Sequence, residues 1–332
     1  MSPEAAAAAI RARISRIAEH PYLLDGAGEP LRCGRDSLLD QATYGVQRMV
    51  VLTNHALSQL AHWLSARNAH DATTPVLLAL PEARPGFEAS DVRALLGGLE
   101  LSGTVGSAGF QVSTCGEGHA GVFQGLMQAA ALIGEGRCEL CIVGGVDSYL
   151  HADTLAWLDG QRRIARDGIR GGFAPGEGVA MFAVATSRAR QRLRLPCLAR
   201  VRSIACATEP RSLQSHEGLL GEGLSEAVRL ATACLDPQED ISDIYADING
   251  ERHRSEDWGF TLLRCPEHIK DGARYITAIS QCGDVGAATA GLQVVLATRA
   301  WQRGYARGSR ALLLGGSWQG LRGAAVLEAG QV

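Results

Sequence analysis

Two cysteines with the spacing of a metal or redox pair, Cys138 and Cys141, are the first candidates for chemistry in this sequence. Such a pair could supply half of a zinc site or the dithiol of a redox motif. The sequence contains no second Cys-x-x-Cys pair to complete a zinc site. Both residues fall in a predicted strand, where side chains three positions apart point to opposite faces. We therefore predict a structural role for the pair, and neither a metal nor a cofactor.

Cys115 and His119 lie where a predicted strand turns into a helix. The strand covers residues 109–115 and leads into the glycine-rich corner Gly116-Glu-Gly-His119. A thiol in such a place acts as a nucleophile only if its surroundings lower its pKa. A buried cysteine more often simply fills the core, which is the interpretation we favour for Cys115.

The composition narrows the class of protein. With 32 basic and 35 acidic residues the net charge is −3, which is not the basic footprint of a nucleic-acid or anionic-membrane binder. The apolar runs are broken by Gly and Arg well short of a membrane span, and no charged-then-apolar leader opens the chain. Nine cysteines, an odd number scattered through apolar stretches, indicate reduced thiols. We expect a cytoplasmic globular protein.

The elements that position these residues follow from hydrophobic spacing. Ser2-Pro-Glu4 predicts the start of a helix that runs to about His20, with a loop to about Arg35. Further helices are predicted over 39–67, 89–97 and 217–234, and further strands over 75–80, 198–206 and 244–248.

One pattern occurs twice. Residues 120–133 are apolar almost all round, which predicts a helix buried in a large domain. Strands over 138–143 and 179–184 follow, and the first ends in a Gly-Gly pair. Near the C-terminus the pattern returns as a helix over 286–303 and strands over 310–314 and 324–328, again with a Gly-Gly pair. The repeat predicts two similar α/β halves, 1–190 and 191–332, in one compact unit.

Two motifs give this architecture a family likeness. Ile142-Val-Gly-Gly-Val-Asp-Ser148 is similar to the strand and Gly-Gly-x-acid motif of the β-ketoacyl-carrier-protein synthases, and Gly172-Phe-Ala-Pro-Gly-Glu-Gly178 to their Gly-Phe-x-x-Gly-Glu-Gly. Together with the repeat, they resemble the thiolase superfamily over nearly the whole chain. The resemblance implies a thiolase fold, whose two duplicated α/β halves form a five-layered α-β-α-β-α arrangement. The family's opening strand has no counterpart, because Met1 opens almost directly on a helix.

The resemblance also locates the family's nucleophile. Active members carry a cysteine at the N-terminus of the buried helix, where the helix dipole and free N–H groups favour the thiolate that accepts an acyl group. Counting back from the Gly-Gly pair places this position on His119. Cys115 could take over only if an insertion has rebuilt the corner. A helix N-terminus disfavours the imidazolium of His119, and a neutral imidazole is a poor acyl carrier.

The two catalytic histidines of the family are replaced by acids. Their positions correspond to Glu251, in Asn249-Gly-Glu251, and to Asp284 after Gly283, and Ile279 replaces the family's lysine. The family's histidines donate hydrogen bonds to the thioester carbonyl and to the enolate formed by decarboxylation, whereas ionised carboxylates only accept. The carboxylates would also repel the malonyl group and the developing negative charge. We therefore predict that decarboxylative condensation is lost.

The resemblance brings His119, Glu251 and Asp284 together. We favour a buried hydrogen-bonded network with Arg252 or Arg254 neutralising the acids, over a divalent-metal site or a new acid–base site. Phe173 and Trp318 fall at the aromatic gates of the family's acyl tunnel, where they either line a residual pocket or fill it. His253 is expected in a solvated loop.

Two classes of function follow. One is a catalytically silent relative that acts by binding, as the family's chain-length factors do beside an active synthase. It would form a homodimer or a heterodimer with a synthase-like chain through the strand over 109–115, with acyl-carrier protein as a candidate partner. Degenerate relatives also resemble accessory proteins of type VI secretion, which suggests an adaptor or chaperone for effector loading. The other class is an acyltransferase, ketoacyl-synthase-type enzyme or hydrolase that uses Cys115 or His119 with Glu251 and Asp284.

Overall fold

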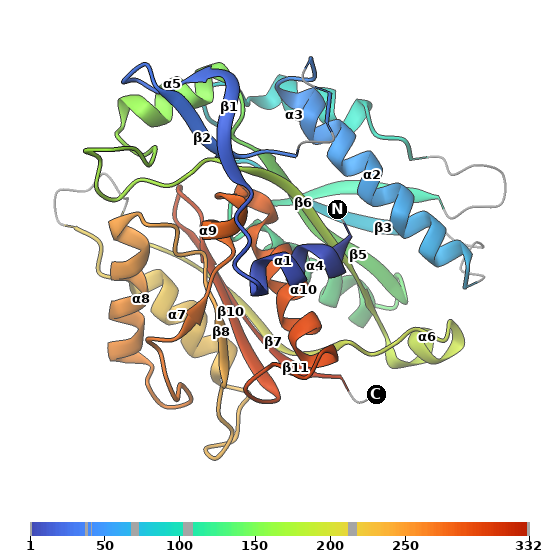
Figure 1. The fold of residues 1–332 in the computed structure, drawn as a ribbon. Helices are drawn as coiled ribbons and strands as arrows, with labels where there is room; N and C mark the ends of the chain where they lie inside the picture. Colours follow the sequence, from blue (N-terminus) through green and yellow to red (C-terminus); the bar gives the residue numbers. More distant parts are fainter. Residues whose placement is uncertain are drawn as a thin grey trace.

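Two large β-sheets organise the chain (Figure 1). The computed structural model describes residues 2–36, 39–40, 42–67, 73–101, 109–211 and 218–330. The first sheet contains β3 (Thr74–Leu80), β4 (Phe110–Glu117), β5 (Leu140–Ser148) and β6 (Glu177–Ala185). The second contains β7 (Ala199–Thr208), β8 (Asp243–Tyr245), β9 (Tyr275–Ile276), β10 (Arg310–Gly316) and β11 (Leu321–Ala329).

The two sheets repeat one topology. The strand orders are β4-β3-β5-β6 and β9-β8-β10-β11-β7. In each sheet the first three strands in these orders are parallel, and the strand that follows next to them (β6 or β11) is antiparallel. The α/β repeat predicted from the sequence is therefore present, and among the described residues β7 has no counterpart in the first sheet.

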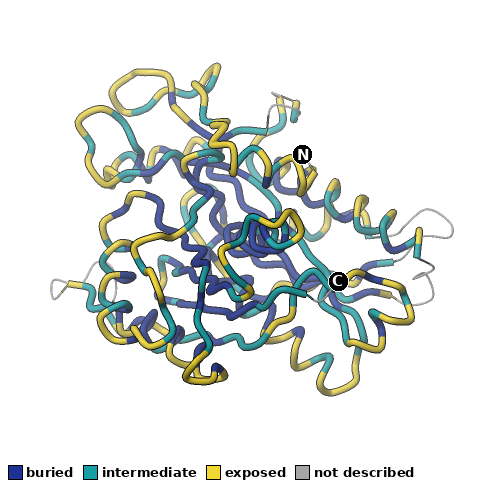
Figure 2. Tube along the Cα trace, turned by 60° about the horizontal axis from the view of Figure 1, so that its bottom comes forward, coloured by how far each residue is buried: buried dark blue, intermediate teal, exposed yellow. Residues whose placement is uncertain are grey.

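Helices complete a five-layered arrangement. α4 (Gly121–Gly134) and α10 (Thr289–Gln302) lie between the sheets, where they share a core cluster with strands of both. α2 (Val46–Ser65) and α3 (Ala89–Gly97) cover the outer face of the first sheet, and α7 (Glu222–Thr232) and α8 (Arg252–Arg264) that of the second. The buried segments gather in the middle of the molecule (Figure 2). The shorter helices are α1 (Pro3–Arg11), α5 (Ala152–Gly160), α6 (Ser187–Arg192), α9 (Ile279–Cys282) and the 3-10 turn η1 (Gly286–Ala288).

Helix α4 is less buried than its apolar sequence predicts. Phe123, Leu126 and Ala129 are buried between the sheets, but Met127 is 44% exposed. The exposed Ala130 and Ala131 lie on the same helix, which packs beside β4. An apolar strip of this helix therefore faces solvent next to the edge of the first sheet.

The N-terminal segment departs most from the prediction. α1 ends at Arg11 instead of near His20, and Arg13 has a φ of 56°, which no α-helical residue adopts. The expected loop to Arg35 contains an antiparallel hairpin of β1 (Ile17–Leu24) and β2 (Pro30–Gly34). The helix expected from residue 39 begins only at Val46, after Gly45 with a φ of 55°.

The remaining elements lie close to their predicted positions. α3 has the predicted bounds, β8 ends at Tyr245 instead of residue 248, and α7 begins at Glu222; the predicted start at Glu217 lies outside the described residues. The helix over 286–303 begins as the turn η1. The short helices α5, α6 and α9 and the helix α8 were not predicted. None of the described helices combines the length and the apolar character needed to cross a membrane.

Candidate functional site

His119, Glu251 and Asp284 lie in one buried network. His119 Nε2 is 2.7 Å from Asp284 Oδ1. Asn249 Nδ2 donates to both acids, at 2.6 Å to Asp284 and 3.0 Å to Glu251. These four residues are between 0% and 8% exposed. The network joins the two halves of the fold, because His119 precedes α4 whereas the other three residues belong to the second half.

The backbone around the network explains how these side chains are held. His119 follows the corner residue Gly118, whose φ is 66° and whose place leaves no room for a Cβ beside Glu82 and Ser317. Asn249 Oδ1 accepts from the N–H of Glu251, and Asp284 Oδ1 accepts from the N–H of Gly286. Asn249 and Asp284 are thus each held by a hydrogen bond within their own loop as well as by the network.

Arg254 supplies the positive charge at the centre of the network. It is 5% exposed, pairs with Asp247, and its Nε lies 3.4 Å from Glu251 Oε2. Arg163 Nε also donates to Glu251, at 2.6 Å. Of the two arginines expected near the acids, the structure places Arg254 inside the network and Arg252 outside it. The Arg252 side chain is 88% exposed and pairs with Glu256.

The arginines determine the ionisation of the two acids. Burial alone would raise the pKa of Glu251, but the charges of Arg254 and Arg163 outweigh it and lower that pKa to about 2. Burial also opposes ionisation of Asp284, yet its contacts with His119 and the charge of Arg254 hold its pKa well below the usual range. Both groups are therefore carboxylates at neutral pH, and the repulsion predicted for a malonyl group is reduced by the paired arginines.

The ring of His119 contacts both an acid and an arginine of this network. The carboxylate of Asp284 can only accept and the guanidinium of Arg254 can only donate. Nε2 therefore donates to Asp284. Arg254 Nη2 lies at nearly equal distances from both ring nitrogens, 3.3 Å from Nδ1 and 3.4 Å from Nε2, so it lies against the ring and not along one lone pair. The ring is 4% exposed and held between a carboxylate and a guanidinium, a poor position from which to attack a thioester.

The backbone N–H groups near His119 are also bonded within the protein. The N–H of Ala120 donates to Ser317 Oγ at 3.0 Å. The N–H groups of Trp318 and Gln319 donate to the carboxylate of Glu82, at 2.7 and 2.6 Å. Donors of this kind stabilise an oxyanion only when they point at an empty position. Here Glu82 already provides the negative charge that they bind.

Cys115 lies apart from the network. Its side chain packs in the core between the sheets, with Sγ 3.9 Å from the carbonyl of Gly121. Burial raises the pKa of this thiol to about 12, so the thiolate that a nucleophile requires is absent at neutral pH.

The cysteine pair is part of the same core. Cys141 is buried there and Cys138 packs against the cluster, although Cys138 precedes β5 instead of lying in it. All nine cysteines are free thiols. Within the described ranges, no group of three or more His, Cys, Asp or Glu residues could hold a metal ion.

The aromatic residues near the network are packed together. Phe173 is 1% exposed, with its ring 5.4 Å from that of Tyr149. Trp318 lies under the guanidinium of Arg163, whose carbon is 3.8 Å from the ring centre, and contacts His253 edge-on. The expectation of a solvated loop for His253 is wrong, because it lies in the first turn of α8 with its side chain 20% exposed. Burial and Arg254 lower the pKa of His253 to about 3.

The acids of the two sequence motifs hold loops in place. Asp147 pairs with Arg84 and accepts from the N–H of Ala287 at 3.0 Å, which fixes η1 directly after Asp284. Glu177 binds Arg48 through both oxygens, each at 2.6 Å. Both motif acids are therefore structural.

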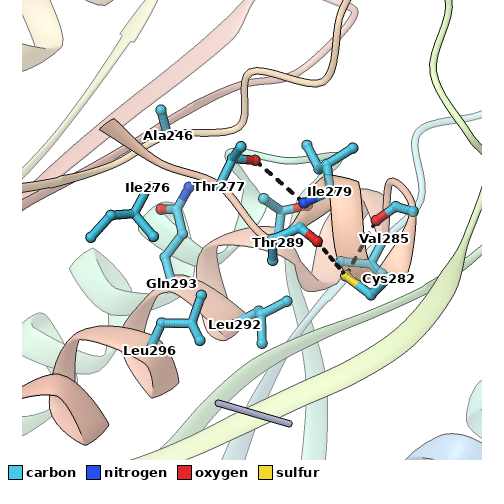
Figure 3. A pocket seen from close by; sticks show the side chains of 12 residues that line it. Ala246, Ile276, Thr277, Ile279, Cys282, Val285, Thr289, Leu292, Gln293 and Leu296 are labelled. Atoms are coloured by element: carbon cyan, nitrogen blue, oxygen red, sulfur yellow. Dashed lines mark hydrogen bonds between the residues drawn. The ribbon is translucent and has the colours of Figure 1, made fainter. Parts of the chain in front are cut away.

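A small cavity is lined by residues of α9 and α10 (Figure 3). Gly283 and Val285 also line it, and its volume of about 10 Å³ has room for one water molecule. Thr289 Oγ1 and Gln293 Oε1 are buried there without a hydrogen-bond partner in the described part of the chain. A cavity of this size cannot hold an acyl chain.

The fold has known counterparts, although the sequence comparisons found none. No protein-family model matches the sequence, and no curated protein matches it. The ishigamide ketosynthase/chain length factor shares 18% identity, with 99% of this chain and 96% of that one aligned and a TM-score of 0.67. The ketosynthase from module 6 of the bacillaene synthase of Bacillus subtilis 168 shares 12% identity, with 98% and 69% aligned and a TM-score of 0.73.

A third counterpart comes from a complex. The type II polyketide synthase assembly AntDE:AntF, an acyl-carrier protein with its ketosynthase, matches at 13% identity over 95% of this chain and 92% of that one, with a TM-score of 0.69. At these identities the likeness shows the fold. The chain has the thiolase fold in its ketosynthase form, as the sequence motifs predicted.

Sequence reasoning missed three members of the site. Arg163 pairs with Glu251, Asp247 pairs with Arg254, and Glu82 binds the backbone beside His119. Only Asp247 had a signal, since it is an acid within the predicted strand 244–248, two residues before Asn249. The others come from segments far away in the sequence and carry no motif.

Proposed function

We propose that this chain, which has the ketosynthase fold, has lost decarboxylative condensation and acts as a non-catalytic subunit that binds a partner protein. The buried ring of His119 carries the proposal, because its Nε2 is bonded to Asp284 and the guanidinium of Arg254 lies against the ring. A condensing site needs a nucleophile with a free electron pair and donors aimed at the thioester oxygen. Here the group in the nucleophile position is an imidazole that is 4% exposed and held between an acid and a guanidinium.

The surroundings of His119 support the same conclusion. Glu251 and Asp284 are ionised acceptors where donors to an enolate are required. The nearby N–H groups of Trp318 and Gln319 are bound to Glu82. Cys115 is a buried thiol with a pKa of about 12, so it offers no replacement nucleophile.

The surface around α4 supports a role in binding. Met127 is 44% exposed, and Ala130 and Ala131 are exposed beside it. The neighbouring strand β4 forms one edge of the first sheet and exposes Gln111, Ser113 and Thr114. A partner could cover the apolar strip and add a strand to β4, as a second copy of this chain or as a synthase-like chain would. Burying a methionine side chain stabilises an interface by about 1.5–3 kcal/mol.

Intact-protein mass spectrometry tests the loss of activity. The wild-type chain, Cys115→Ala and His119→Ala are incubated with acyl-CoA and with acyl-carrier protein loaded with the same acyl group. We expect no acyl mass shift in any of the three proteins. A shift that is lost in one variant would identify a nucleophile and contradict the proposal.

Association of purified chains tests the binding surface. Met127→Glu places a charge on the apolar strip, and Leu263→Glu is its control, because Leu263 is 80% exposed on α8 in the other half. We expect Met127→Glu to weaken homodimerisation in sedimentation, or retention of a copurified chain, at least tenfold while Leu263→Glu changes neither. The identity of a copurified chain distinguishes a synthase from a secretion effector. Equal effects of both variants would remove the α4 surface from the proposal.

A further inference from the structure

The two halves differ at one edge of their sheets. In the second sheet β7 pairs antiparallel with β11 over nine register positions, from Ala199 to Thr208. β11 corresponds to β6, since each is the antiparallel strand next to its parallel neighbours. Within the described residues β6 pairs with β5 alone, and no strand occupies the position that β7 takes in the other half. α1, which precedes this sheet in the chain, packs on α9 and α10 as a helix.

The exposed edge of β6 lacks the features that protect natural sheet edges. Residues 178–185 read Gly-Val-Ala-Met-Phe-Ala-Val-Ala, which is eight positions without a charge or a proline. The ladder with β5 is regular over nine pairs and contains no bulge. No backbone hydrogen bond outside that ladder involves these residues in the described part of the chain. Edge strands normally carry lysine, proline or a bulge because an unprotected edge accepts another strand.

The side chains of β6 are half-buried, whereas those of its counterpart are covered. Phe182 and Val184 face the central core and Met181 faces α2, and all three are of intermediate exposure. In β11 the residues Ala324, Ala325 and Val326 are 0% exposed. The difference follows from β7, which covers the edge of β11, whereas no described strand covers the edge of β6.

β7 also indicates the chemistry of a matching segment. Ile204 and Cys206 contact the central core, and Ala205 and Ala207 contact the cluster under α7. Over residues 204–207 uncharged side chains therefore face both layers, whereas Arg202 pairs with Glu239 and Glu328 nearer the start of the strand. The segment is extended and antiparallel to its neighbour. The same requirements hold at β6, because its side chains are apolar toward α10 and toward α2.

We propose that the open edge of β6 binds an extended, uncharged, mainly apolar segment of another protein, which adds as an antiparallel fifth strand. This site lies on the opposite edge of the first sheet from the β4 surface discussed above. It therefore provides a second and independent place for a partner. Strand addition of this kind draws its affinity from main-chain hydrogen bonds and its specificity from alternate side chains.

A fluorescent peptide with the sequence of β7, residues 199–208 carrying Arg200→Thr, Arg202→Thr and Cys206→Ser so that its side chains are uncharged, is the probe. Its binding is followed by anisotropy with the wild type, with Ala183→Lys on the β6 edge, and with Val201→Lys as control. Val201 is 41% exposed on β7, the edge strand of the other sheet. Val201→Lys therefore places the same charge on a sheet edge where no peptide binding is expected. Thermal unfolding establishes that each variant is folded.

We expect saturable binding that is weakened at least tenfold by Ala183→Lys and less than twofold by Val201→Lys. Amide exchange of residues 178–185 should slow at least tenfold when the peptide is added to the wild type. Absence of saturable binding, or equal weakening by both variants, would overturn the proposal. If a homodimer is lost in Ala183→Lys and kept in Met127→Glu, a second copy of this chain binds at the β6 edge. That result would refute the proposal that a different protein binds there. None of these outcomes depends on the acylation test.

Discussion

Replacing Arg254 with methionine removes the charge on which three buried acids depend. Asp247, Glu251 and Asp284 are between 0% and 4% exposed, and Arg254 pairs with or stabilises each of them. Arg163 compensates only Glu251. Removing one partner of a buried ion pair typically costs about 3–5 kcal/mol, which is a large part of a folding free energy of about 5–15 kcal/mol. We expect a loss of about 4 kcal/mol at pH 7.

The variant Arg252→Met is the matched control. It makes the same substitution two residues away on the same helix, where the side chain is 88% exposed. An exposed pair of this kind contributes about 0–1 kcal/mol. The free energy of unfolding of the wild type and both variants is measured with guanidinium chloride by tryptophan fluorescence.

The pH dependence of the loss provides a second check. In the wild type the pKa of Glu251 is about 2 against an ordinary value of 4.5, so its stabilising contribution is complete above pH 4.5 and disappears as the pH falls toward 2. Without Arg254 the pKa of Glu251 and of Asp284 in the folded state must rise, and protonation then relieves their unpaired charge. The cost of Arg254→Met should therefore shrink between pH 7 and pH 4. A cost below about 1 kcal/mol at pH 7, or one shared by Arg252→Met, would refute this account of the network.

Three further outcomes are expected. Glu251→Gln should lower the free energy of unfolding by about 3 kcal/mol at pH 7, and this loss should disappear between pH 4.5 and pH 2. Chemical denaturation at each pH measures it, and a loss that does not change with pH would contradict a pKa of about 2 for Glu251. Under native conditions a thiol reagent should modify the exposed Cys234 at least a hundredfold faster than Cys115, as read by peptide mapping; comparable rates would show that the core opens. Phe173→Ala should cost about 3–5 kcal/mol by chemical denaturation because the ring is 1% exposed; a near-neutral result would indicate that it lines an open pocket.

The sequence predicted the fold because its signals are local. The apolar runs that became β3, β5 and β10 and the two Gly-Gly pairs each lie within one segment, and their repetition revealed the duplication. The N-terminal segment failed for the same reason. Its alanine-rich run favours a helix through residue 9, but residues 12–35 lack an apolar period, and the hairpin there is fixed by pairing and by contacts with distant loops such as the bond between Arg16 N–H and the Gln281 carbonyl.

The candidate site could be predicted only in part. The likeness to a family indicated that His119, Glu251 and Asp284 lie close together, and burial of two acids required a nearby cation. Either Arg252 or Arg254 could meet that requirement, since both follow Glu251 within one turn. The choice depends on which face of α8 turns inward, and Arg254 is on that face together with Trp258, four residues later. Arg163 and Glu82 were beyond prediction because only the folded chain brings them to the site.

The network also explains why its members must act as a set. Arg254 lowers the pKa of Glu251 and of Asp284, and these acids together with Asp247 compensate its buried charge. The imidazole of His119 then fits because it donates to Asp284 while the guanidinium of Arg254 lies against the ring. Replacing Glu251 with a hydrogen-bond donor would leave Arg163 and part of Arg254 without a counter-charge. Each of these residues is thus stabilised by the others, and His119 lies at the centre of a contact between the two halves.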